Sequence, residues 1–333
     1  MQNRSNKSTI LLTRPQIEKM VNLRQVLRIV EKAFAAHGRG AVQMPPKIYL
    51  HLNRYKGDFR AMPAYVEDTG ACGMKWVNVH PGNRTHGLPA VMAIIILSDP
   101  RTGYPAAIMD GTYITNLRTG ASGGVAAKYL ANRSSSNVGF VGCGVQAMYQ
   151  FLSLREIFDI KTVAMHDKSL AQAKRFMTIV RQLGYKAECF SNIKGCVSGR
   201  DVVVTTTPSR KPLIKAAWIS PGTHINAIGA DAKGKEELDP SILKKARIVV
   251  DDMEQAAHSG EINVPLSKGY LKEKDIYATL GQVVIGKRTG RSSPCQITVF
   301  DSTGLAIQDM AVASYVYKRS LAGQGRLRKI SFL

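Results

Sequence analysis

The sequence is short of acidic residues, of cysteine and of long apolar runs, and each shortage excludes a class of protein. Its five cysteines, at positions 72, 143, 189, 196 and 295, are odd in number and form no Cys-x-x-Cys pair. Scattered thiols favour a reduced, cytoplasmic protein over a disulfide framework or a zinc site, so no metal is expected. The longest apolar run, AVMAIIIL at 90–97, is far below the roughly 20 residues of a membrane span. The polar start of the chain lacks the apolar core of a secretory signal, and no membrane partner is expected.

The shortage of acids leaves 24 acidic residues against 46 basic ones, a formal net charge of +22. A nucleic-acid surface needs clustered Lys and Arg, with aromatic residues among them in many single-strand binders. Here the basic residues are spread along the chain, with only a mild concentration in GQGRLRKI at 323–330. We therefore expect no nucleic-acid partner and interpret the charge as a solvated surface that attracts small anions.

At 333 residues the chain is long enough for two domains. Apolar residues recur at helical spacing from Leu23 to Phe34, with Gly38 expected past the helix end. From Lys47 to Asp110 the texture changes to short strands separated by Gly, Pro and Asp turns, which predicts an antiparallel or mixed sheet. A helix at about 112–131 follows, and its many small residues indicate a close backbone approach.

Strands and helices alternate after the polar joint at 132–136. NVGFVG, TVAMHD, KAECF, DVVVTTT, THINAIG and RIVVDD are the expected strands, with helices at about 145–157 and 169–183. Alternation of this kind predicts a doubly wound parallel sheet of the Rossmann type. A last strand and a long helix end the chain, and we expect this helix to return to the first domain. The predicted fold is thus α/β, with a Rossmann domain at 119–304 inserted in a discontinuous α+β domain at 1–118 and 305–333.

VGFVGCGVQA carries the spacing Gly142-x-Gly144-x-x-Ala147 directly after one strand and at the start of a helix. In a dinucleotide site the first Gly permits the tight turn and the second lets the pyrophosphate approach the backbone. The small third residue allows close helix packing. Asp167 ends the second strand 25 residues beyond Gly142 (167 − 142), where a ribose-binding carboxylate is expected. This acid favours NAD, and Lys168 beside it leaves NADP open as an alternative.

Several motifs resemble the ornithine cyclodeaminase/mu-crystallin family in order and spacing. They are GMKWVNVHPGN, GYPAAIMDGTYITNLRTGASGGVAAKYLA, VGFVGCGVQA, TTTPSRKP, INAIGADAKGKEELDP, DDMEQAAHSGEIN and ITVFDSTGLAIQD. The resemblance covers about residues 9–331 and is greatest to the archaeal-type alanine dehydrogenase branch. It implies a homodimer whose subunits each have a substrate-binding and dimerisation domain and a Rossmann domain, with the active site in the cleft between the domains. The family contains alanine dehydrogenases, ornithine cyclodeaminases and cyclic ketimine reductases.

The resemblance also assigns residues that would contact an amino acid or keto acid substrate. Arg118 in NLRTG matches a carboxylate-binding arginine, a role that suits a planar guanidinium; in isolation it would be an exposed helix residue. Lys75 in GMKWV matches a lysine that holds the carboxylate and transfers protons, although its chain could instead extend to the sheet edge. Asp231 in the GAD motif matches the acid that activates water, where a cap or turn residue is the alternative.

The expected cofactor contacts lie mostly in the predicted turns and strand ends of the Rossmann domain. Arg118, the last residue before that domain, is the exception. The contacts are Arg118, Thr119, Gly142, Gly144, Val145, Gln146, Ala147, Asp167, Lys168, Ser169, Thr206, Thr207, Gly229, Ala230, Asp231, Lys235 and Ser302. Ser302 is placed near the nicotinamide by resemblance, and Asp301 or Ser302 is also a candidate helix cap. Glu236, Glu237 and Asp239 are interpreted as ordinary charge at a helix start.

Arg60 is the residue that distinguishes the family's activities in the sequence. In the cyclodeaminase pattern an acid precedes the Met-Pro of this strand, whereas here the segment reads GDFRAMPAYV. A buried arginine would repel the distal ammonium of ornithine and help to bind a small carboxylate; the alternative is that it points to solvent. We therefore predict NAD-dependent oxidative deamination of L-alanine, with Lys75 and Asp231 as catalytic residues and Arg60, Lys75 and Arg118 as substrate ligands. Ornithine cyclodeaminase, cyclic ketimine reductase and a non-catalytic, crystallin-like binding protein remain the alternatives.

Overall fold

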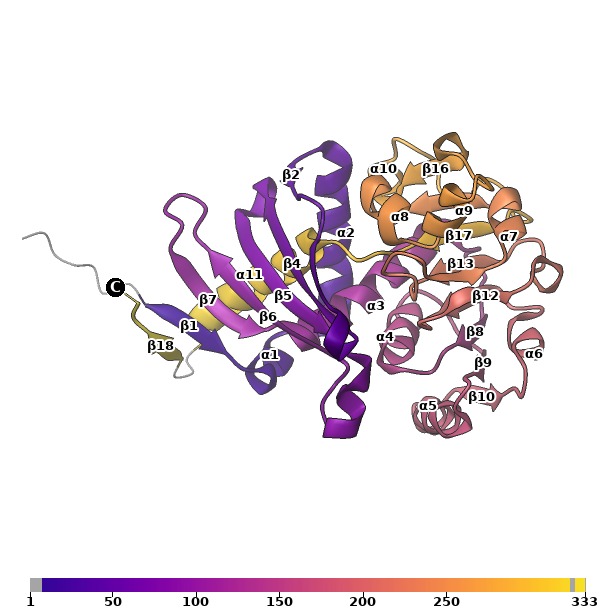
Figure 1. The fold of residues 1–333 in the computed structure, drawn as a ribbon, viewed down its shortest axis with the longest axis horizontal. Coiled ribbons are helices and arrows are strands. Elements are labelled where there is room, and N and C mark those ends of the chain that lie inside the picture. Colours follow the sequence, from indigo (N-terminus) through magenta and orange to yellow (C-terminus); the bar gives the residue numbers. More distant parts are fainter. Residues whose placement is uncertain (1–7, 324–326, 333) are drawn as a thin grey trace, which may run out of the picture. The chain divides into compact units, whose positions relative to one another are not determined.

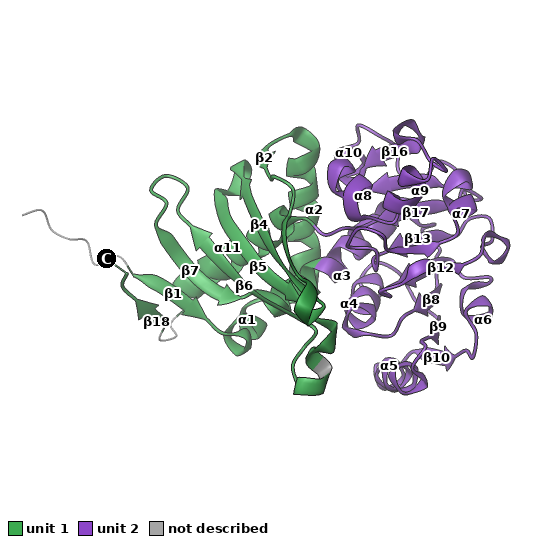
Figure 2. Cartoon of the chain, in the orientation of Figure 1, with its two compact units in different colours: residues 1–118, 305–333 green, residues 119–304 purple. Residues whose placement is uncertain are grey.

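The computed structural model describes residues 8–323 and 327–332, and the chain divides into two compact units. Unit 1 comprises residues 1–118 and 305–333, and unit 2 comprises residues 119–304 (Figure 2). Residues 1–7, 324–326 and 333, which belong to the predicted first domain, lie outside the described residues, so part of the basic segment at 323–330 does too. Unit 2 is therefore an insertion in unit 1, as the predicted fold class requires.

Unit 1 is built on an eight-stranded mixed sheet in the order β18-β1-β7-β6-β5-β4-β2, with β3 paired to β4 (Figure 1). β1 and β7 run parallel, and the other neighbouring strands run antiparallel. The strands are β1 (Thr9–Leu12), β2 (Val42–Gln43), β3 (Ile48–Leu52), β4 (Gly57–Val66), β5 (Ala71–Val79), β6 (Val91–Ser98), β7 (Pro105–Asp110) and β18 (Arg328–Ile330). The predicted run of strands between Lys47 and Asp110 is confirmed.

One face of this sheet, called the inner face, is covered by helix α11 (Ala306–Ala322), which also packs against α2 (Leu23–Arg39). Directly opposed residues of antiparallel strands share a face. The register thus places Met62, Lys75, Ile95 and Met109 in one buried row across β4, β5, β6 and β7. The opposite side is called the outer face. The C-terminal helix therefore does return to the first unit, and it supplies the second wall of that unit's core.

Helix α2 follows α1 (Arg14–Met20) and shows how local signals set helix ends. The Asn22 side chain accepts a hydrogen bond from the Gln25 amide, which caps the first turn. The helix continues through Gly38 to Arg39 and ends at Gly40, whose φ of 76° is left-handed. The prediction that Gly38 lies past the helix end was wrong, because the terminating glycine is the one that adopts the left-handed conformation.

Unit 2 contains an eight-stranded parallel sheet in the order β10-β9-β8-β11-β13-β17-β15-β16. Its strands are β8 (Asn137–Val141), β9 (Thr162–His166), β10 (Lys186–Cys189), β11 (Val202–Thr205), β13 (His224–Ala227), β15 (Arg247–Val250), β16 (Ile276–Thr279) and β17 (Thr298–Asp301). Its helices are α4 (Val145–Leu154), α5 (Leu170–Gln182), α6 (Ile193–Val197), α7 (Pro240–Lys245), α8 (Met253–Ser259), α9 (Asn263–Ser267) and α10 (Leu280–Val284). A separate parallel pair joins β12 (Arg210–Ile214) to β14 (Glu236–Leu238).

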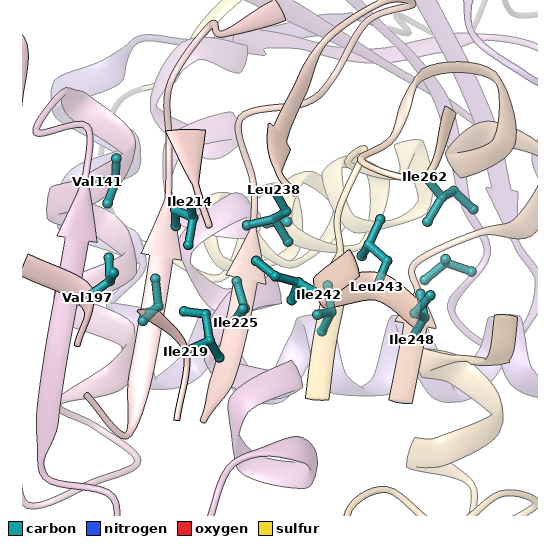
Figure 3. Close-up of a cluster of buried hydrophobic side chains, with 14 of the residues drawn as sticks. Val141, Val197, Ile214, Ile219, Ile225, Leu238, Ile242, Leu243, Ile248 and Ile262 are labelled. Carbon is teal, nitrogen blue, oxygen red and sulfur yellow. The ribbon is translucent and has the colours of Figure 1, made fainter. Parts of the chain in front are cut away.

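Both faces of the unit 2 sheet are covered, because successive strand residues point to opposite sides. Val141 and Ile225 join a buried aliphatic cluster with Val197 of α6 and Ile242 of α7 (Figure 3). Phe140, the neighbour of Val141 in β8, instead stacks edge-on with Phe151 of α4 and Phe176 of α5. The sheet is therefore doubly wound, and the predicted Rossmann fold is confirmed.

Helix α3 (Gly111–Leu130) carries the small residues that predicted a close approach, and the neighbour is α4. A Cβ atom on Gly120 would lie 2.4 Å from the carbonyl oxygen of Tyr149, and one on Gly123 would collide with the amide of Gln150. The Gln150 side chain donates to the carbonyl oxygen of Thr119, and the Asn226 side chain donates to that of Gly123. The predicted close approach is therefore confirmed, and at these two glycines the approaching atoms belong to α4.

Candidate functional site

Two buried cations of unit 1 share one buried carboxylate. Asp309, in the first turn of α11, accepts a hydrogen bond from Lys75 Nζ at 2.7 Å through Oδ2 and one from Arg118 Nε at 3.0 Å through Oδ1. The Gln308 side-chain oxygen accepts a further bond from Arg118 Nη1 at 3.3 Å. Lys75 is 1% exposed, Arg118 5% and Asp309 0%. The alternatives of a Lys75 extended to the sheet edge and an exposed Arg118 are therefore wrong.

Burial changes the acid–base behaviour of Lys75. Desolvation and the nearby charge of Arg118 together lower the pKa of Lys75 to about 7, while Asp309 opposes the fall. An amine with a pKa near neutrality can give and take a proton at physiological pH. When Lys75 is protonated, the group of Lys75, Arg118 and Asp309 has a net charge of +1, which matches a single carboxylate ligand.

Asp309 was missed by the sequence reasoning, although it lies in the motif ITVFDSTGLAIQD. The available signal is an acid in the otherwise apolar stretch LAIQDMAVA, because a buried charge needs a partner. Within unit 1, Asp309 is the acid that contacts both Lys75 and Arg118.

Arg60 is also buried on the inner face, so the alternative that it points to solvent is wrong. Its register partner is Val77, two residues along β5 from Lys75. Arg60 Nε donates to Asp58 Oδ1 at 2.7 Å, and its guanidinium lies over the Tyr49 ring at 5.1 Å from the centroid. The positive charge at this position is therefore compensated by Asp58. The argument that Arg60 repels a distal ammonium loses most of its electrostatic force, and its role as a substrate ligand stays a prediction.

The predicted phosphate-binding turn of unit 2 lies between β8 and α4. Gly142 has a φ of 90°, and a Cβ atom there would meet the carbonyl oxygen of Thr206 at 2.9 Å, so glycine is required. Gly144 is the N-cap of α4, makes no side-chain cap, and has open space where a side chain would stand. Ala147 is fully buried, while Val145 is exposed. A helix N-terminus with open space in front of it fits an anionic phosphate group.

Asp167 follows β9 and is fixed by backbone donors on both carboxylate oxygens. The Cys143 amide donates to Oδ2 and the Ser169 amide donates to Oδ1, each at 2.7 Å. Asp167 thus ties the glycine-rich turn to the start of α5, where Ser169 is the N-cap. A carboxylate held at the end of the second strand fits the hydroxyl groups of a ribose. Lys168 beside it is exposed.

The loops after β11 and β13 lie close together, and a buried acid holds them. Thr206 Oγ1 donates to the carbonyl oxygen of Gly142 at 2.9 Å. Thr207 donates from both its amide and its hydroxyl to Glu237 Oε1, at 2.7 and 2.6 Å. A Cβ atom on Gly229 would lie 2.2 Å from the Thr207 carbonyl oxygen, so glycine is required by the neighbouring loop, and its contact with a cofactor stays a prediction. The Ala230 side chain is fully buried.

The strand expected at 223–229 is β13 (His224–Ala227), and Asp231 lies four residues beyond its end. Its carboxylate pairs with Lys235 Nζ at 2.5 Å, and both side chains are partly exposed. Lys235 therefore lies beside the predicted catalytic acid, and its contact with the cofactor stays a prediction. The next helix, α7, is capped by Asp239, whose side chain accepts from the Ser241 amide, so the cap interpretation applies to that acid.

The prediction that Glu236, Glu237 and Asp239 are ordinary charge at a helix start was wrong for the two glutamates. Glu236 and Glu237 lie in β14, and the Glu237 side chain is completely buried. The polar stretch KGKEELDP gives no sign of burial. Its strand β14 pairs with β12, more than 20 residues earlier in the chain, and spacing along the sequence does not reveal that pairing.

Ser302 follows β17 and is buried, and its amide donates to the carbonyl oxygen of Ala227 at 3.0 Å. Neither Asp301 nor Ser302 caps the last helix, because α11 begins at Ala306 with Leu305 at its N-cap. The loop is held instead by Asp251, whose Oδ2 accepts from the amides of Thr303 and Gly304 at 2.7 Å each. The cap interpretation was therefore wrong, and the contact of Ser302 with a nicotinamide stays a prediction.

Within 8–323 and 327–332, no helix has both the length and the hydropathy needed to cross a bilayer. The same residues contain no group of three or more His, Cys, Asp or Glu side chains arranged to hold a metal ion.

Comparison with known proteins gives consistent results over almost the whole chain. The sequence pattern of the ornithine cyclodeaminase/mu-crystallin family matches residues 7–324. Alanine dehydrogenase of Archaeoglobus fulgidus is 53% identical over 314 residues, which cover 94% of this chain and 96% of that protein. A solved archaeal alanine dehydrogenase dimer with bound NAD has a TM-score of 0.94 at 52% identity, covering 98% of this chain and 100% of that one.

A reductase is also similar. Delta(1)-pyrroline-2-carboxylate reductase of Thermococcus litoralis, solved in complex with NADH and L-proline, has a TM-score of 0.92 at 35% identity, covering 94% of this chain and 98% of that one. These proteins share one fold and differ in the reaction that they catalyse. From the family match and the identity to its members, the chain belongs to the ornithine cyclodeaminase/mu-crystallin family.

Proposed function

We propose that the chain is an NAD-dependent dehydrogenase that oxidises L-alanine reversibly. In the balanced reaction, alanine, NAD⁺ and water give pyruvate, NADH, ammonium and a proton. The substrate would be held by unit 1 and the dinucleotide by unit 2. Bound NAD supplies the hydride acceptor for the substrate α-carbon.

The buried group of Lys75, Arg118 and Asp309 is the observation that carries the proposal. Asp309 takes one of the three N–H groups of the Lys75 ammonium and the Nε–H of Arg118. A lysine ammonium has three donors and a guanidinium five, so both cations retain donors for a substrate carboxylate. Because these side chains are buried, their contacts are stronger than the same contacts in water. With its pKa near 7, Lys75 is also suited to exchange a proton with the substrate amine.

The turn after β8 supports a dinucleotide as the cofactor. The open N-terminus of α4 at Gly144 would hold the pyrophosphate, and Asp167 would accept hydrogen bonds from the adenosine ribose. A 2′-phosphate would meet the fixed negative charge of Asp167, so NAD is favoured over NADP. Thr119, Gln146, Ser169 and Thr206 remain proposed contacts of the same cofactor.

Asp231 is the proposed base for the hydrolytic half of the reaction. A water molecule that attacks the imine carbon must lose a proton, and a partly exposed carboxylate beside Lys235 can accept it. The resulting carbinolamine then releases ammonia when its nitrogen is protonated and its hydroxyl is deprotonated.

Alanine, among the family's substrates, is favoured by the 53% identity to the Archaeoglobus fulgidus enzyme over 94% of the chain. The Asp58–Arg60 ion pair has no net charge on the inner face, which is consistent with a substrate whose side chain is small and neutral. Because the two charges compensate each other, the pair favours neither a substrate with an acidic side chain nor one with a distal ammonium, such as ornithine.

One assay tests the proposal. Purified protein is incubated with NAD⁺ and either L-alanine or L-ornithine, and NADH, ammonia and proline are followed. Sustained NADH formation with alanine, together with pyruvate and ammonia, is the expected result. Proline and ammonia from ornithine without net NADH would contradict it and identify a cyclodeaminase. In the Asp231→Asn variant we expect kcat for alanine to fall by at least about a hundredfold; unchanged turnover would remove Asp231 from its proposed role.

A cyclic imine reductase is the second candidate, favoured by the similarity to the Thermococcus litoralis enzyme. Its substrate also has a carboxylate beside the reacting carbon, so the Lys75–Arg118 pair would serve it equally. NAD(P)H oxidation with Δ¹-pyrroline-2-carboxylate, in a protein that is silent with alanine, would establish this reaction instead.

We also propose that the protein is a homodimer formed through the outer face of the unit 1 sheet. The register places Trp76 opposite Ile94 on this face, and Ile48 and Leu50 of β3 belong to the same side. Ile48 is 66% exposed, Leu50 53% and Ile94 47%. Exposed aliphatic residues gathered on one sheet face mark a protein–protein contact, and a related archaeal alanine dehydrogenase is a dimer.

A further inference from the structure

Glu237 is a completely buried carboxylate whose two oxygens receive four hydrogen bonds. Oε1 accepts from the amide and the hydroxyl of Thr207, at 2.7 and 2.6 Å. Oε2 accepts from the Thr205 hydroxyl at 2.6 Å and from the Gly229 amide at 3.0 Å. Burial raises the pKa of Glu237, and the hydrogen bonds from Thr205, Thr207 and Gly229 oppose the rise. A carboxylate placed this deep is costly unless its acceptor sites are filled, as they are here.

The four donors come from the ends of two neighbouring strands. Thr205 is the last residue of β11 and Thr207 follows it, while Gly229 lies two residues beyond the end of β13. β11 pairs on its other side with β8, and β9 and β10 continue beyond β8, so the strand order reverses between β8 and β11. In open α/β sheets, ligands bind outside the carboxyl ends of the strands at this reversal.

A continuous set of contacts links the glycine-rich turn to the turn that carries Asp231. Thr206 donates to the Gly142 carbonyl oxygen, and the next residue, Thr207, is held by Glu237. Glu237 in turn holds the Gly229 amide, two residues before Asp231. Glu237 therefore holds the loops after β11 and β13 together, and Thr206 joins the loop after β8 to them.

We propose that Glu237 is a positioning residue for dinucleotide binding, which sets the spacing of the strand-end loops around the cofactor and the place of the Asp231 turn. The inference rests on the proposed function only in that the ligand is NAD. It predicts that loss of the Glu237 charge weakens NAD⁺ binding in protein that is fully folded, because the loops no longer have one fixed separation.

The chain offers a matched control in Glu261, which is also completely buried and acts on the same strand. Glu261 accepts hydrogen bonds from the amides of Glu237 and Leu238, at 2.8 and 2.6 Å through Oε1, and so anchors the β14 backbone. Burial and the charge of Glu237 raise the pKa of Glu261 well above its ordinary value. In Glu261→Gln the amide oxygen can still accept from the same two β14 amides. A purely structural role for Glu237 predicts equal consequences for the two substitutions.

The test measures the NAD⁺ dissociation constant by calorimetry in the full-length wild-type, Glu237→Gln and Glu261→Gln proteins. Thermal unfolding is recorded first, and binding is measured well below the lowest melting temperature. We expect NAD⁺ affinity to fall at least about tenfold in Glu237→Gln, as small misplacements of positioned groups do, and to stay within about twofold of wild type in Glu261→Gln. Wild-type affinity in folded Glu237→Gln, or an equal loss in Glu261→Gln, would overturn the proposal.

Thr205 provides a second route should Glu237→Gln fail to fold. Thr205→Val removes one donor to Glu237, whereas Thr205→Ser keeps the hydroxyl. A weaker NAD⁺ affinity in the valine variant, restored in the serine variant, supports the proposal, and equal affinities in both contradict it. If the wild-type protein binds NAD⁺ but does not oxidise alanine, the proposed reaction fails and the role of Glu237 is still tested. If it binds no NAD⁺, both proposals fail.

Discussion

Asp309 is the residue on which the unit 1 site depends, because it compensates two buried cations at once. In Asp309→Asn the side chain keeps its shape and loses its charge, so Lys75 and Arg118 are left buried without a counter-ion. Removing one partner from a buried ion pair costs about 3–5 kcal/mol. We expect a loss of that size in the free energy of unfolding, measured in urea.

The exposed pair Arg14–Glu18 on α1 is the control for that substitution, since it is a similar ion pair in solvent. Glu18→Gln should change the free energy of unfolding by no more than about 0.5 kcal/mol. Equal effects of the two variants would show that burial does not strengthen the Asp309 interactions.

The pKa of Lys75 predicts how carboxylate binding depends on pH. Because the folded-state pKa is lowered from 10.5 to about 7, the ammonium form is present below pH 7 and is lost as the pH rises through that value. Pyruvate affinity should therefore weaken above pH 7, by up to about tenfold per pH unit, with the midpoint shifted upward in the complex. Calorimetric titration of the NAD-saturated protein across this range measures it. A pH-independent affinity in wild type, or an unchanged dependence in Lys75→Met, would contradict the assignment.

At the scale of single residues, the sequence predicts the groups that belong to a recognisable motif and misses those that support them. Lys75 and Arg118 could be named because their neighbours resemble a known family, and both are buried as that role requires. Asp309 and Glu237 act through contacts between segments 234 and 30 residues apart, with Lys75 and Thr207 respectively. Such contacts depend on how strands are ordered in space, which spacing along the chain does not reveal.

At the scale of elements, the approach of α3 to α4 depends on the absence of a side chain at Gly120. A Cβ atom there would lie 2.4 Å from a backbone oxygen of α4, which cannot move without shifting the helix. Gly120→Ala should therefore destabilise the protein by about 1–3 kcal/mol, although alanine is favoured in a helix by about 1 kcal/mol. Urea unfolding measures the difference. The control is Gly82→Ala, at a position with open space and no left-handed backbone, which should leave the free energy of unfolding nearly unchanged. If Gly120→Ala also left it unchanged, α3 and α4 would be shown to separate easily.

Strands and helices with a clear pattern of apolar residues could be predicted from the sequence, whereas the residues at which they end could be predicted less well. The strands of unit 2 read as short apolar runs between turns, and every one that the sequence indicated is present. The strand expected to reach Gly229 ends instead at Ala227, because the residues after it turn to meet Thr207 and Glu237. β14 was taken for a helix start, since three residues of a polar strand carry no alternation that could be recognised.

At the scale of the whole molecule, the outer face of the unit 1 sheet is the surface to test for association. Ile94 lies on this face opposite Trp76 and is 47% exposed. A stable dimer buries about 800 Å² per partner, and a carboxylate in the middle of such a contact would be desolvated without a cation. Ile94→Glu should therefore convert the dimer to a monomer, as measured by sedimentation or light scattering at micromolar concentration.

Leu170 of α5 provides the matched substitution, because it is also an exposed aliphatic residue and belongs to unit 2 rather than to the sheet of unit 1. Leu170→Glu should leave the protein dimeric. The decisive comparison is between the two variants at equal concentration. If both are monomers, added negative charge alone disperses this strongly basic chain. If both are dimers, the association uses another surface, and the exposed row on β3 and β6 needs a different partner.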